Sequence, residues 1–223
     1  MLKAVLLDID GTLVASNDAH AQAWADALRS FGYDCDVDQI RRWIGMGGDK
    51  ILPRVDERLD REQEPGKSIL AVRLEIFMDR YAPALKPTPG AIPFLDRLHA
   101  AGLLRVAATS AKEKEYKIIT ETAGIAGRLD LATTADDAKH SKPDADVVKS
   151  ALEKAGATAA QAVYVGDTPY DVEAAHRAGL PIVALRCGGW RDADLRDADA
   201  VYEDPAELDR GFERSPIGER LAS

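Results

Sequence analysis

The chain has 223 residues, of which 46% are hydrophobic and 30% are charged, and its formal net charge is −9 at pH 7. This length suits one medium-sized domain or a domain with a second, smaller lobe, and the acidic balance argues against a nucleic-acid partner. No apolar run approaches the length of a membrane span, so no membrane partner is expected. The two cysteines, Cys35 and Cys187, are too few and too scattered for a disulfide scaffold or a zinc site. Two free thiols are typical of a reducing compartment, so we expect a cytoplasmic protein.

The first predicted element is a short buried strand that ends on carboxylates. The stretch KAVLLD, residues 3–8, is apolar and partly β-branched, which is typical of a strand in a parallel sheet. Asp8 and Asp10 stand at its end with one residue between them. Because like charges this close repel each other, we expect a positive group nearby.

From residue 16 to residue 85 the pattern is helical, and no strand is predicted. Four segments carry apolar residues at helical spacing: NDAHAQAWADALRSFG, DVDQIRRWIG, DKILPRVDERLD and KSILAVRLEIFMDRYAPAL. The turn-rich stretch KPTPG, residues 86–90, closes this part of the chain. We therefore predict an all-helical insertion over residues 15–88.

After the insertion, predicted strands and helices alternate. The predicted strands are LRVAATS, LDLATTA, QAVYVGD, PIVALRC and DAVYED. This alternation predicts an α/β fold with a doubly wound, parallel (Rossmann-like) sheet, formed by residues 1–14 and 89–223. The tail RSPIGERLAS is expected to be loosely held.

Polar residues gather at one predicted edge of this sheet. In doubly wound sheets the binding crevice lies beyond the carboxyl ends of the strands. The polar residues expected there are Asp8, Asp10, Thr109, Ser110, Lys142, Asp167 and Asp171. Taken singly, several have ordinary explanations, such as helix capping by the hydroxyls or solvation of the lysine. Their coincidence at one edge favours a functional site.

Together these groups suit phosphoryl transfer. Carboxylate oxygens with room for water and phosphate are the ligands that Mg²⁺ prefers, and the cation would remove the repulsion between Asp8 and Asp10. We expect Asp8 to attack phosphorus and form an aspartyl-phosphate. Asp10 would protonate the leaving oxygen and then deprotonate the attacking water. Lys142 would offset charge on the transferring group, and a hydroxyl with a nearby backbone N–H would hold the phosphate oxygens.

On four motifs, the chain resembles the haloacid dehalogenase-like hydrolase superfamily, in the group with a helical cap inserted after the first strand. DIDGTLV, residues 8–14, is similar to the first family motif, and ATS, residues 108–110, to the second. Lys142 in SKPD resembles the third motif, and GDTPYD, residues 166–171, the fourth. The resemblance covers nearly the whole chain, and phosphoglycolate phosphatases and β-phosphoglucomutase-like phosphatases are the members that it resembles.

The resemblance implies a role for each carboxylate. Asp8 is the implied nucleophile and Asp10 the implied general acid and base. Mg²⁺ would be bound by Asp8, the backbone carbonyl of Asp10, and Asp167. Asp171 would hold either a metal-bound water or Lys142.

Two motifs offer a choice of residue. The position at the end of a strand favours Thr109 as the phosphate binder, with Ser110 close behind. Lys142 is favoured over Lys139 because it directly precedes Pro143, as in the family pattern.

The insertion is expected to act as a cap that excludes water and contacts the leaving group. In its loop WIGMGGDK, Gly47 would let the backbone approach a ligand and Lys50 would meet an anionic group, although simple helix ends are an alternative interpretation. Arg73 is expected on a solvated helix face. His20 resembles a histidine of β-phosphoglucomutase-like relatives, and would either couple cap closure to Asp10 or only pack.

These expectations predict a phosphatase for a small phosphorylated metabolite. Dehalogenases that resemble this core lack a carboxylate at the position of Asp10, so phosphate monoesters are favoured over organohalides. A phosphosugar mutase is one alternative, although the cap loop lacks the arginine that such mutases place there. A phospho-acceptor signalling module is another, although receiver domains are shorter and have no cap. Monomer and homodimer both remain open.

Overall fold

The computed structural model describes residues 1–222, and its centre is one six-stranded, fully parallel sheet. The strand order is β3-β2-β1-β4-β5-β6, so the chain winds outward in both directions from β1. The strands are β1 (Ala4–Leu7), β2 (Leu104–Ala108), β3 (Leu131–Thr133), β4 (Ala162–Gly166), β5 (Ile182–Leu185) and β6 (Ala200–Tyr202). All six strands that the sequence predicts are present, and the predicted doubly wound parallel sheet is confirmed.

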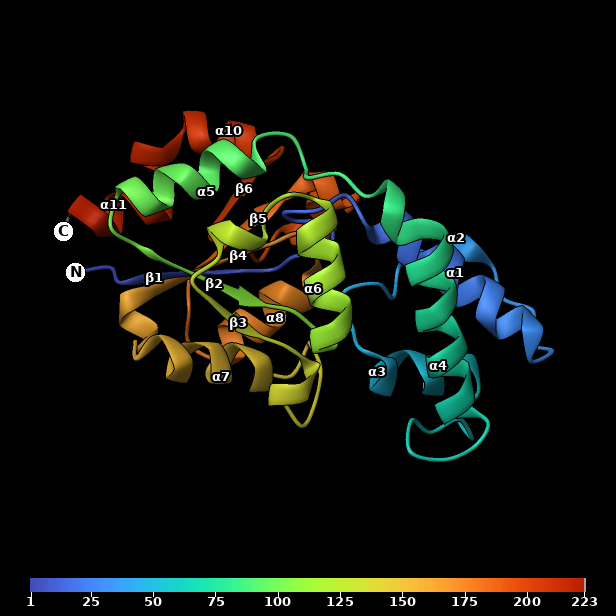
Figure 1. Cartoon of the computed structure of the whole chain (residues 1–223). Coiled ribbons are helices and arrows are strands. Elements are labelled where there is room, and N and C mark those ends of the chain that lie inside the picture. The colour runs from blue at the N-terminus through green and yellow to red at the C-terminus, as the bar shows by residue number, and fades with distance from the viewer. Residues whose placement is uncertain (223) are drawn as a thin grey trace.

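Helices cover both faces of the sheet because the strands are buried on both sides. In β1, Val5 and Leu7 belong to one apolar cluster and Ala4 and Leu6 to another, as the alternation of side chains along a strand requires. The first face packs against α5 (Ala91–Ala100), α6 (Glu113–Thr122), α10 (Pro205–Arg210) and α11 (Pro216–Ala222). The second face packs against α7 (Asp146–Ala155) and α8 (Pro169–Arg177), and the short α9 (Asp192–Leu195) follows β5 (Figure 1). No helix within residues 1–222 has both the length and the apolar content needed to cross a membrane.

A separate group of helices is inserted between β1 and α5, which confirms the predicted helical insertion as part of the fold. It contains α1 (Asn17–Ser30), α2 (Val37–Arg41), α3 (Gly48–Val55) and α4 (Gly66–Ile76). These helices pack around their own apolar cluster, which includes Trp24, Leu28, Ile40, Ile51 and Ile69. In Figure 1 they lie to one side of the sheet, beyond the end of β1 where the chain leaves it. We call this group the cap.

The fourth predicted cap helix is shorter than the sequence pattern indicates. The pattern over residues 67–85 predicts one helix, but α4 ends at Ile76 and is followed by a π-helical turn (Phe77–Tyr81) and a 3₁₀ turn (Ala82–Ala84). Phe77 is completely buried in the cluster shared with the sheet. The widened turn therefore lies where the cap helix meets the core.

Two chain segments join the cap to the core, and they run side by side. The Ala15 N–H donates to the Lys86 carbonyl at 3.0 Å, and the Thr88 N–H donates to the Leu13 carbonyl at 3.0 Å. The Thr88 hydroxyl also donates to the Thr12 carbonyl at 2.6 Å. Both crossings therefore meet the core next to the end of β1.

The expectation of a loosely held tail is wrong for the residues that the structure describes. Residues 216–222 form α11, and Ile217 is fully buried in the core cluster. The Ser215 hydroxyl accepts a hydrogen bond from the Gly218 N–H at 3.2 Å, which satisfies a donor in the first turn of this helix. One apolar anchor and one capping hydroxyl hold the segment.

Candidate active site

Asp8 lies directly beyond β1, at the centre of the sheet. Its backbone N–H donates to the Val165 carbonyl of β4 at 2.9 Å, and its side chain is only 2% exposed. One carboxylate oxygen, Oδ1, accepts a hydrogen bond from Lys142 Nζ at 2.6 Å. The other, Oδ2, is buried and has no hydrogen-bond partner within residues 1–222. An unpaired buried oxygen of this kind is costly, so this position suits a further positive or hydrogen-bonding group.

Lys142 is a buried cation held between two carboxylates. Its ammonium lies 2.6 Å from Asp8 Oδ1 and 2.7 Å from Asp171 Oδ1, and its side chain is 1% exposed. The Tyr164 hydroxyl lies 3.4 Å from the same ammonium and 3.1 Å from Asp171 Oδ1. Burial acts to lower the pKa of Lys142, but attraction to Asp171 and Asp8 outweighs it and the pKa is raised. Lys142 is therefore charged at neutral pH.

Asp167 follows β4, and neighbouring side chains fix its carboxylate. Thr12 Oγ1 donates to Oδ1 at 2.8 Å, and Asn17 Nδ2 donates to Oδ2 at 2.9 Å. Burial, followed by repulsion from Asp171, raises the pKa of Asp167 to about 7. The protein thus holds this carboxylate in a position where a positive partner is favoured.

Asp8, Asp167 and Asp171 form a buried acidic cluster. One oxygen from each lies within 4.8 Å of the others. Burial raises the pKa of Asp8, Lys142 lowers it, and the neighbouring carboxylates add to the increase, so the net shift is upward. A buried cluster of three carboxylates that each offer an oxygen fits a hard divalent cation. Within this cluster, Asp171 is engaged by protein donors, because its Oδ1 accepts from Lys142 at 2.7 Å and its Oδ2 accepts from the Thr168 hydroxyl at 2.7 Å. This agrees with the expectation that Asp171 holds Lys142.

The Asp10 side chain belongs to a different group of contacts. Its Oδ1 accepts a hydrogen bond from Ser16 Oγ at 2.5 Å and lies 2.8 Å from His20 Nε2. The His20 ring in turn stacks on Phe77, with ring centroids 4.1 Å apart. Burial acts to raise the pKa of Asp10, but attraction to His20 and the hydrogen bonds from His20 and Ser16 outweigh it and the pKa is lowered. His20 therefore contacts the predicted acid/base from the first cap helix.

Thr109 and Ser110 follow β2 and line the same cavity as Asp8. The Thr109 hydroxyl accepts from the Ala111 N–H at 3.0 Å, and the Ser110 hydroxyl donates to the Gly45 carbonyl of the cap loop at 3.2 Å. Neither hydroxyl caps α6, whose N-cap residue is Lys112. The alternative explanation of these residues as helix caps is therefore wrong.

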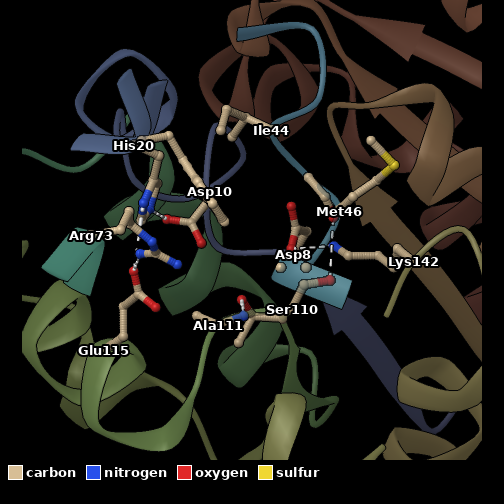
Figure 2. Close-up of a pocket in the computed structure, with 15 residues that line it drawn as sticks. Asp8, Asp10, His20, Ile44, Met46, Arg73, Ser110, Ala111, Glu115 and Lys142 are labelled. Carbon is tan, nitrogen blue, oxygen red and sulfur yellow. Dashed lines mark hydrogen bonds and ion pairs between the residues drawn. The ribbon is translucent and has the colours of Figure 1, made fainter. Parts of the chain in front are cut away.

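These groups line one small cavity between the cap and the core, with a volume of about 40 Å³. Such a volume holds only a few water molecules, so the cap lies close to the carboxylates. Figure 2 shows Lys142 beside Asp8 on one side and His20 beside Asp10 on the other. The lining residues are Asp8, Asp10, His20, Trp24, Ile44, Gly45, Met46, Gly47, Gly48, Arg73, Thr109, Ser110, Ala111, Glu115 and Lys142.

Of the cap residues considered from sequence, some line the cavity and others do not. Gly47 lines the cavity, and its N–H donates to Ser141 Oγ at 3.0 Å. Lys50 is not among the lining residues, because its ammonium pairs with Asp144 at 2.7 Å outside the cavity. The structure therefore does not bring Lys50 to Asp8. The expectation of a solvated face for Arg73 is wrong, since its side chain is 14% exposed and lines the cavity.

Sequence analysis missed several residues of the site. Thr12 and Asn17 orient Asp167, and Tyr164 contacts the ammonium of Lys142. A tyrosine in a strand buried on both faces is a usable signal, because its hydroxyl needs a partner. Glu115 offered no signal, since an acidic residue in the first turn of a helix is common.

Comparisons with known proteins agree with this geometry. A family model described as haloacid dehalogenase-like hydrolase matches residues 5–185. Phosphoglycolate phosphatase of Rhodospirillum rubrum is 32% identical, with 100% of this chain and 96% of that protein covered. Glyceraldehyde 3-phosphate phosphatase of Methanopyrus kandleri is 28% identical, with 100% and 99% covered. The crystal structure of a hydrolase from Pseudomonas syringae superposes with a TM-score of 0.89 at 28% identity, over 96% of this chain and 99% of that one.

The chain belongs to the haloacid dehalogenase-like hydrolases. Within this family it is a phosphoric monoester hydrolase, similar to the phosphoglycolate phosphatases. The resemblance predicted from the four motifs is confirmed. The buried cluster of three aspartates is able to hold a divalent metal ion.

Proposed function

We propose that the protein hydrolyses a small phosphate monoester in two steps, with Mg²⁺ as its metal and Asp8 as the nucleophile. One observation carries this proposal. Asp8 lines the cavity and keeps one buried carboxylate oxygen free, while its other oxygen is held by Lys142. A nucleophile needs such a free, oriented oxygen.

The residues present fit a divalent cation. The position of Asp167 and the mutual repulsion within the acidic cluster both favour a positive partner. We propose that Asp8, Asp167 and the backbone carbonyl of Asp10 hold Mg²⁺, with Asp171 holding Lys142 and supporting this site. When bound, the ion supplies positive charge that keeps Asp8 ionised and neutralises the phosphate oxygens.

In the first proposed step, a carboxylate oxygen of Asp8 attacks phosphorus and the bond from phosphorus to the ester oxygen breaks. Asp10 gives its proton to the leaving oxygen, so an alcohol departs and an aspartyl-phosphate remains. In the second step Asp10 takes a proton from water as that water attacks phosphorus. The bond from phosphorus to Asp8 then breaks, which releases inorganic phosphate and restores the carboxylate of Asp8 and the protonated form of Asp10 with which the first step began.

His20 and Ser16 are proposed to set the protonation state of Asp10. In the structure they lower its pKa, so Asp10 is ionised at neutral pH and ready to act as a base. A phosphate dianion that enters the cavity repels this charge and raises the pKa of Asp10, which allows it to carry the proton that the first step needs. This arrangement supports a positioning role for His20 rather than packing alone.

The remaining predicted residues receive proposed roles that follow their positions. Thr109, Ser110 and the backbone near Gly47 are proposed to contact the phosphate or the ester, because all three line the cavity. Lys142 is proposed to offset charge on the transferring group. For Lys50 we propose a different role, in which its pairing with Asp144 helps to hold the cap closed.

We propose that residues 15–88 move as a lid. The paired crossings at Ala15–Lys86 and Leu13–Thr88 support these bounds, because they place both joints next to each other. The size of the cavity supports motion as well, since a space of about 40 Å³ is too small for a phosphate ester unless the cap moves.

Hydrolysis is favoured over phosphosugar mutase activity. The cap loop has Asp49 and Lys50 where an arginine would be needed to grip a second phosphate. Asp49 accepts a hydrogen bond from the Ser141 N–H at 3.2 Å, and Lys50 is paired with Asp144. Asp49 is an anion and Lys50 is already paired, so neither residue supplies the cavity with a cation that could bind a second phosphate. We also propose a cytoplasmic location, on the ground that Cys35 and Cys187 are both free thiols.

The proposal is tested by assaying p-nitrophenyl phosphate with the purified protein, with and without Mg²⁺. Asp8→Asn is expected to abolish turnover and Asp10→Asn to lower it by about 10²–10⁴-fold. Asp38→Asn, which changes an exposed carboxylate on α2, is the matched control and should retain wild-type activity. Near wild-type turnover by Asp8→Asn, or full activity after removal of divalent cations, would contradict the proposal.

A further inference from the structure

A buried ion pair crosses from the cap to the core at the edge of the catalytic cavity. Arg73 of α4 donates through Nη1 to Oε1 of Glu115 on α6. The two side chains are 14% and 3% exposed. The guanidinium also lies over the Trp24 ring, with Cζ 5.3 Å from the ring centroid. No step of the proposed mechanism uses this pair.

The pair lies where the leaving group of a phosphate ester would be. Figure 2 shows Arg73 and Glu115 on the side of the cavity that holds Asp10 and His20, away from Lys142. His20 Nδ1 is 3.6 Å from Glu115 Oε1. Because Asp10 is placed to protonate the leaving oxygen, the group attached to that oxygen would extend towards this pair.

The same pair also borders a larger cleft between cap and core, of about 610 Å³. The residues that line both spaces are Gly47, Gly48, Arg73, Thr109, Ser110 and Glu115. A leaving group too large for the closed cavity would therefore pass Arg73 and Glu115 on its way into the cleft.

The charges on this side of the cavity disfavour an anionic leaving group. Glu115 already neutralises Arg73. Among the described residues, the lining contains one other lysine or arginine, Lys142, and it is already paired with Asp8 and Asp171. In the small cavity, a carboxylate or second phosphate would meet the negative charges of Glu115 and Asp10 without a cation of its own. The further cations of the larger cleft, Arg61, Lys67 and Lys112, do not line the small cavity. Such like-charge contacts in a closed site are strongly unfavourable.

The hydrogen-bonding groups on this side suit a hydroxyl instead. Arg73 Nε is a buried donor that has no hydrogen-bond partner in the described chain. The Glu115 carboxylate beside it only accepts. A hydroxyl both donates and accepts, so it is able to pair with either group, whereas a carboxylate is able to pair only with the donor.

We propose that the Arg73–Glu115 pair selects esters whose leaving group is a neutral, hydroxyl-bearing alcohol and rejects esters whose leaving group carries a carboxylate or a second phosphate. The inference rests on the proposed function, because it names the substrate class of that site. Glu115 supplies the rejection through its charge, and Arg73 supplies the unused hydrogen-bond donor.

The test compares substrates that differ only in this group. One pair is 2-hydroxyethyl phosphate and 2-phosphoglycolate, and the other is glycerol 3-phosphate and 3-phosphoglycerate. For the wild-type protein, we expect kcat/KM to be at least about tenfold higher for the neutral member of each pair. Glu115→Gln should reduce this ratio by about tenfold or more, because it removes the negative charge with little change of shape. Glu113→Gln, on the same helix but exposed and outside the cavity lining, is the control and should leave the ratio unchanged.

The readout is a ratio measured on one protein sample, so the fraction of folded enzyme cancels. If Glu115→Gln fails to fold because Arg73 is left unpaired, the double variant Arg73→Gln/Glu115→Gln removes both charges together and should also lower the ratio. A wild-type preference for the anionic esters, or a ratio unchanged in the Glu115 variants, would overturn the inference.

p-Nitrophenyl phosphate separates this inference from the proposed function. Hydrolysis of p-nitrophenyl phosphate without the expected preference would overturn the selectivity alone. No hydrolysis of any ester in the presence of Mg²⁺ would overturn the proposed function, and the selectivity with it.

Discussion

Replacement of Lys142 by methionine tests whether this buried ammonium compensates the carboxylates around it. The variant keeps the length and apolar stem of the side chain but leaves Asp8 and Asp171 without their cation. At contact distances of 2.6 and 2.7 Å, each pair has a gross attraction of about 6 kcal/mol at an effective dielectric constant of about 20. Desolvation of the ammonium offsets much of this, and loss of one partner from a buried pair typically costs about 3–5 kcal/mol. We expect a loss of that size in the free energy of unfolding at pH 7.

The assay is urea unfolding followed by circular dichroism, with EDTA present so that no divalent ion replaces the lost charge. The raised pKa of Lys142 determines the pH dependence. Because the folded pKa lies above the unfolded value, the contribution of Lys142 is complete below that unfolded value and is lost only as the pH rises through the folded pKa. The ammonium itself therefore adds no pH dependence between pH 7 and pH 9. Lys142 also lowers the pKa of Asp8 and of Asp167, which is already raised to about 7, so its removal raises both further and the deficit should be larger at pH 9 than at pH 7.

Two comparisons make this prediction sharper. Lys139→Met changes an exposed lysine in the same loop and should leave the unfolding midpoint unchanged. Excess Mg²⁺ should reduce the deficit of the Lys142 variant, because a cluster with one more uncompensated negative charge binds a dication more tightly. A Lys142→Met protein that is as stable as the wild type in EDTA would refute the assigned role.

Three further predictions concern the acid/base, the core and the cap. His20→Gln should raise the pKa of Asp10, because attraction to His20 is the main effect that lowers it. The decline of kcat with rising pH, which reports Asp10 in the substrate complex, should therefore move to higher pH, and an unshifted profile would contradict this. Asp130→Asn should lower the free energy of unfolding by about 1 kcal/mol at pH 7. Asp130 is exposed, but it accepts three hydrogen bonds from Arg105, at 2.9, 2.9 and 2.7 Å, and these lower its pKa. That loss should vanish as the pH falls through the lowered pKa, and urea unfolding that shows an equal deficit at pH 3 would count against it. For the cap, small-angle scattering should show a smaller radius of gyration after addition of Mg²⁺ and beryllium fluoride, and identical profiles would argue against closure.

The parts of the fold that could be predicted from sequence depend on local patterns. The apolar run before Asp8 and the run before Asp167 each specify a strand, and the turn residues after them place both carboxylates at one edge. Helical spacing in the cap predicted α1 and α2 in the same way. The extent of α4 was harder to predict, because its pattern continues through the π-helical turn at residues 77–81, where packing of Phe77 against the core ends the regular helix.

The parts of the site that could not be predicted depend on contacts between distant segments. Asn17 and Asp167 are 150 positions apart, and Arg73 and Glu115 are 42 apart. Each of these residues has an ordinary explanation in its own helix or loop, and the pairing arises only when the cap is placed on the core. For Lys50 the sequence suggested a contact that the structure does not show. This lysine lies in the predicted cap loop, but its ammonium pairs with Asp144 outside the cavity.

The central claim is that Asp8 carries the phosphoryl group, and trapping that intermediate tests it most directly. The Asp10→Asn protein would be mixed with p-nitrophenyl phosphate and Mg²⁺, quenched in acid and reduced with borohydride, which converts an aspartyl-phosphate into homoserine. Peptide mass spectrometry should find homoserine at position 8, and the Asp8→Asn protein should show none. Modification of a different residue, or undiminished turnover by Asp8→Asn, would contradict the mechanism.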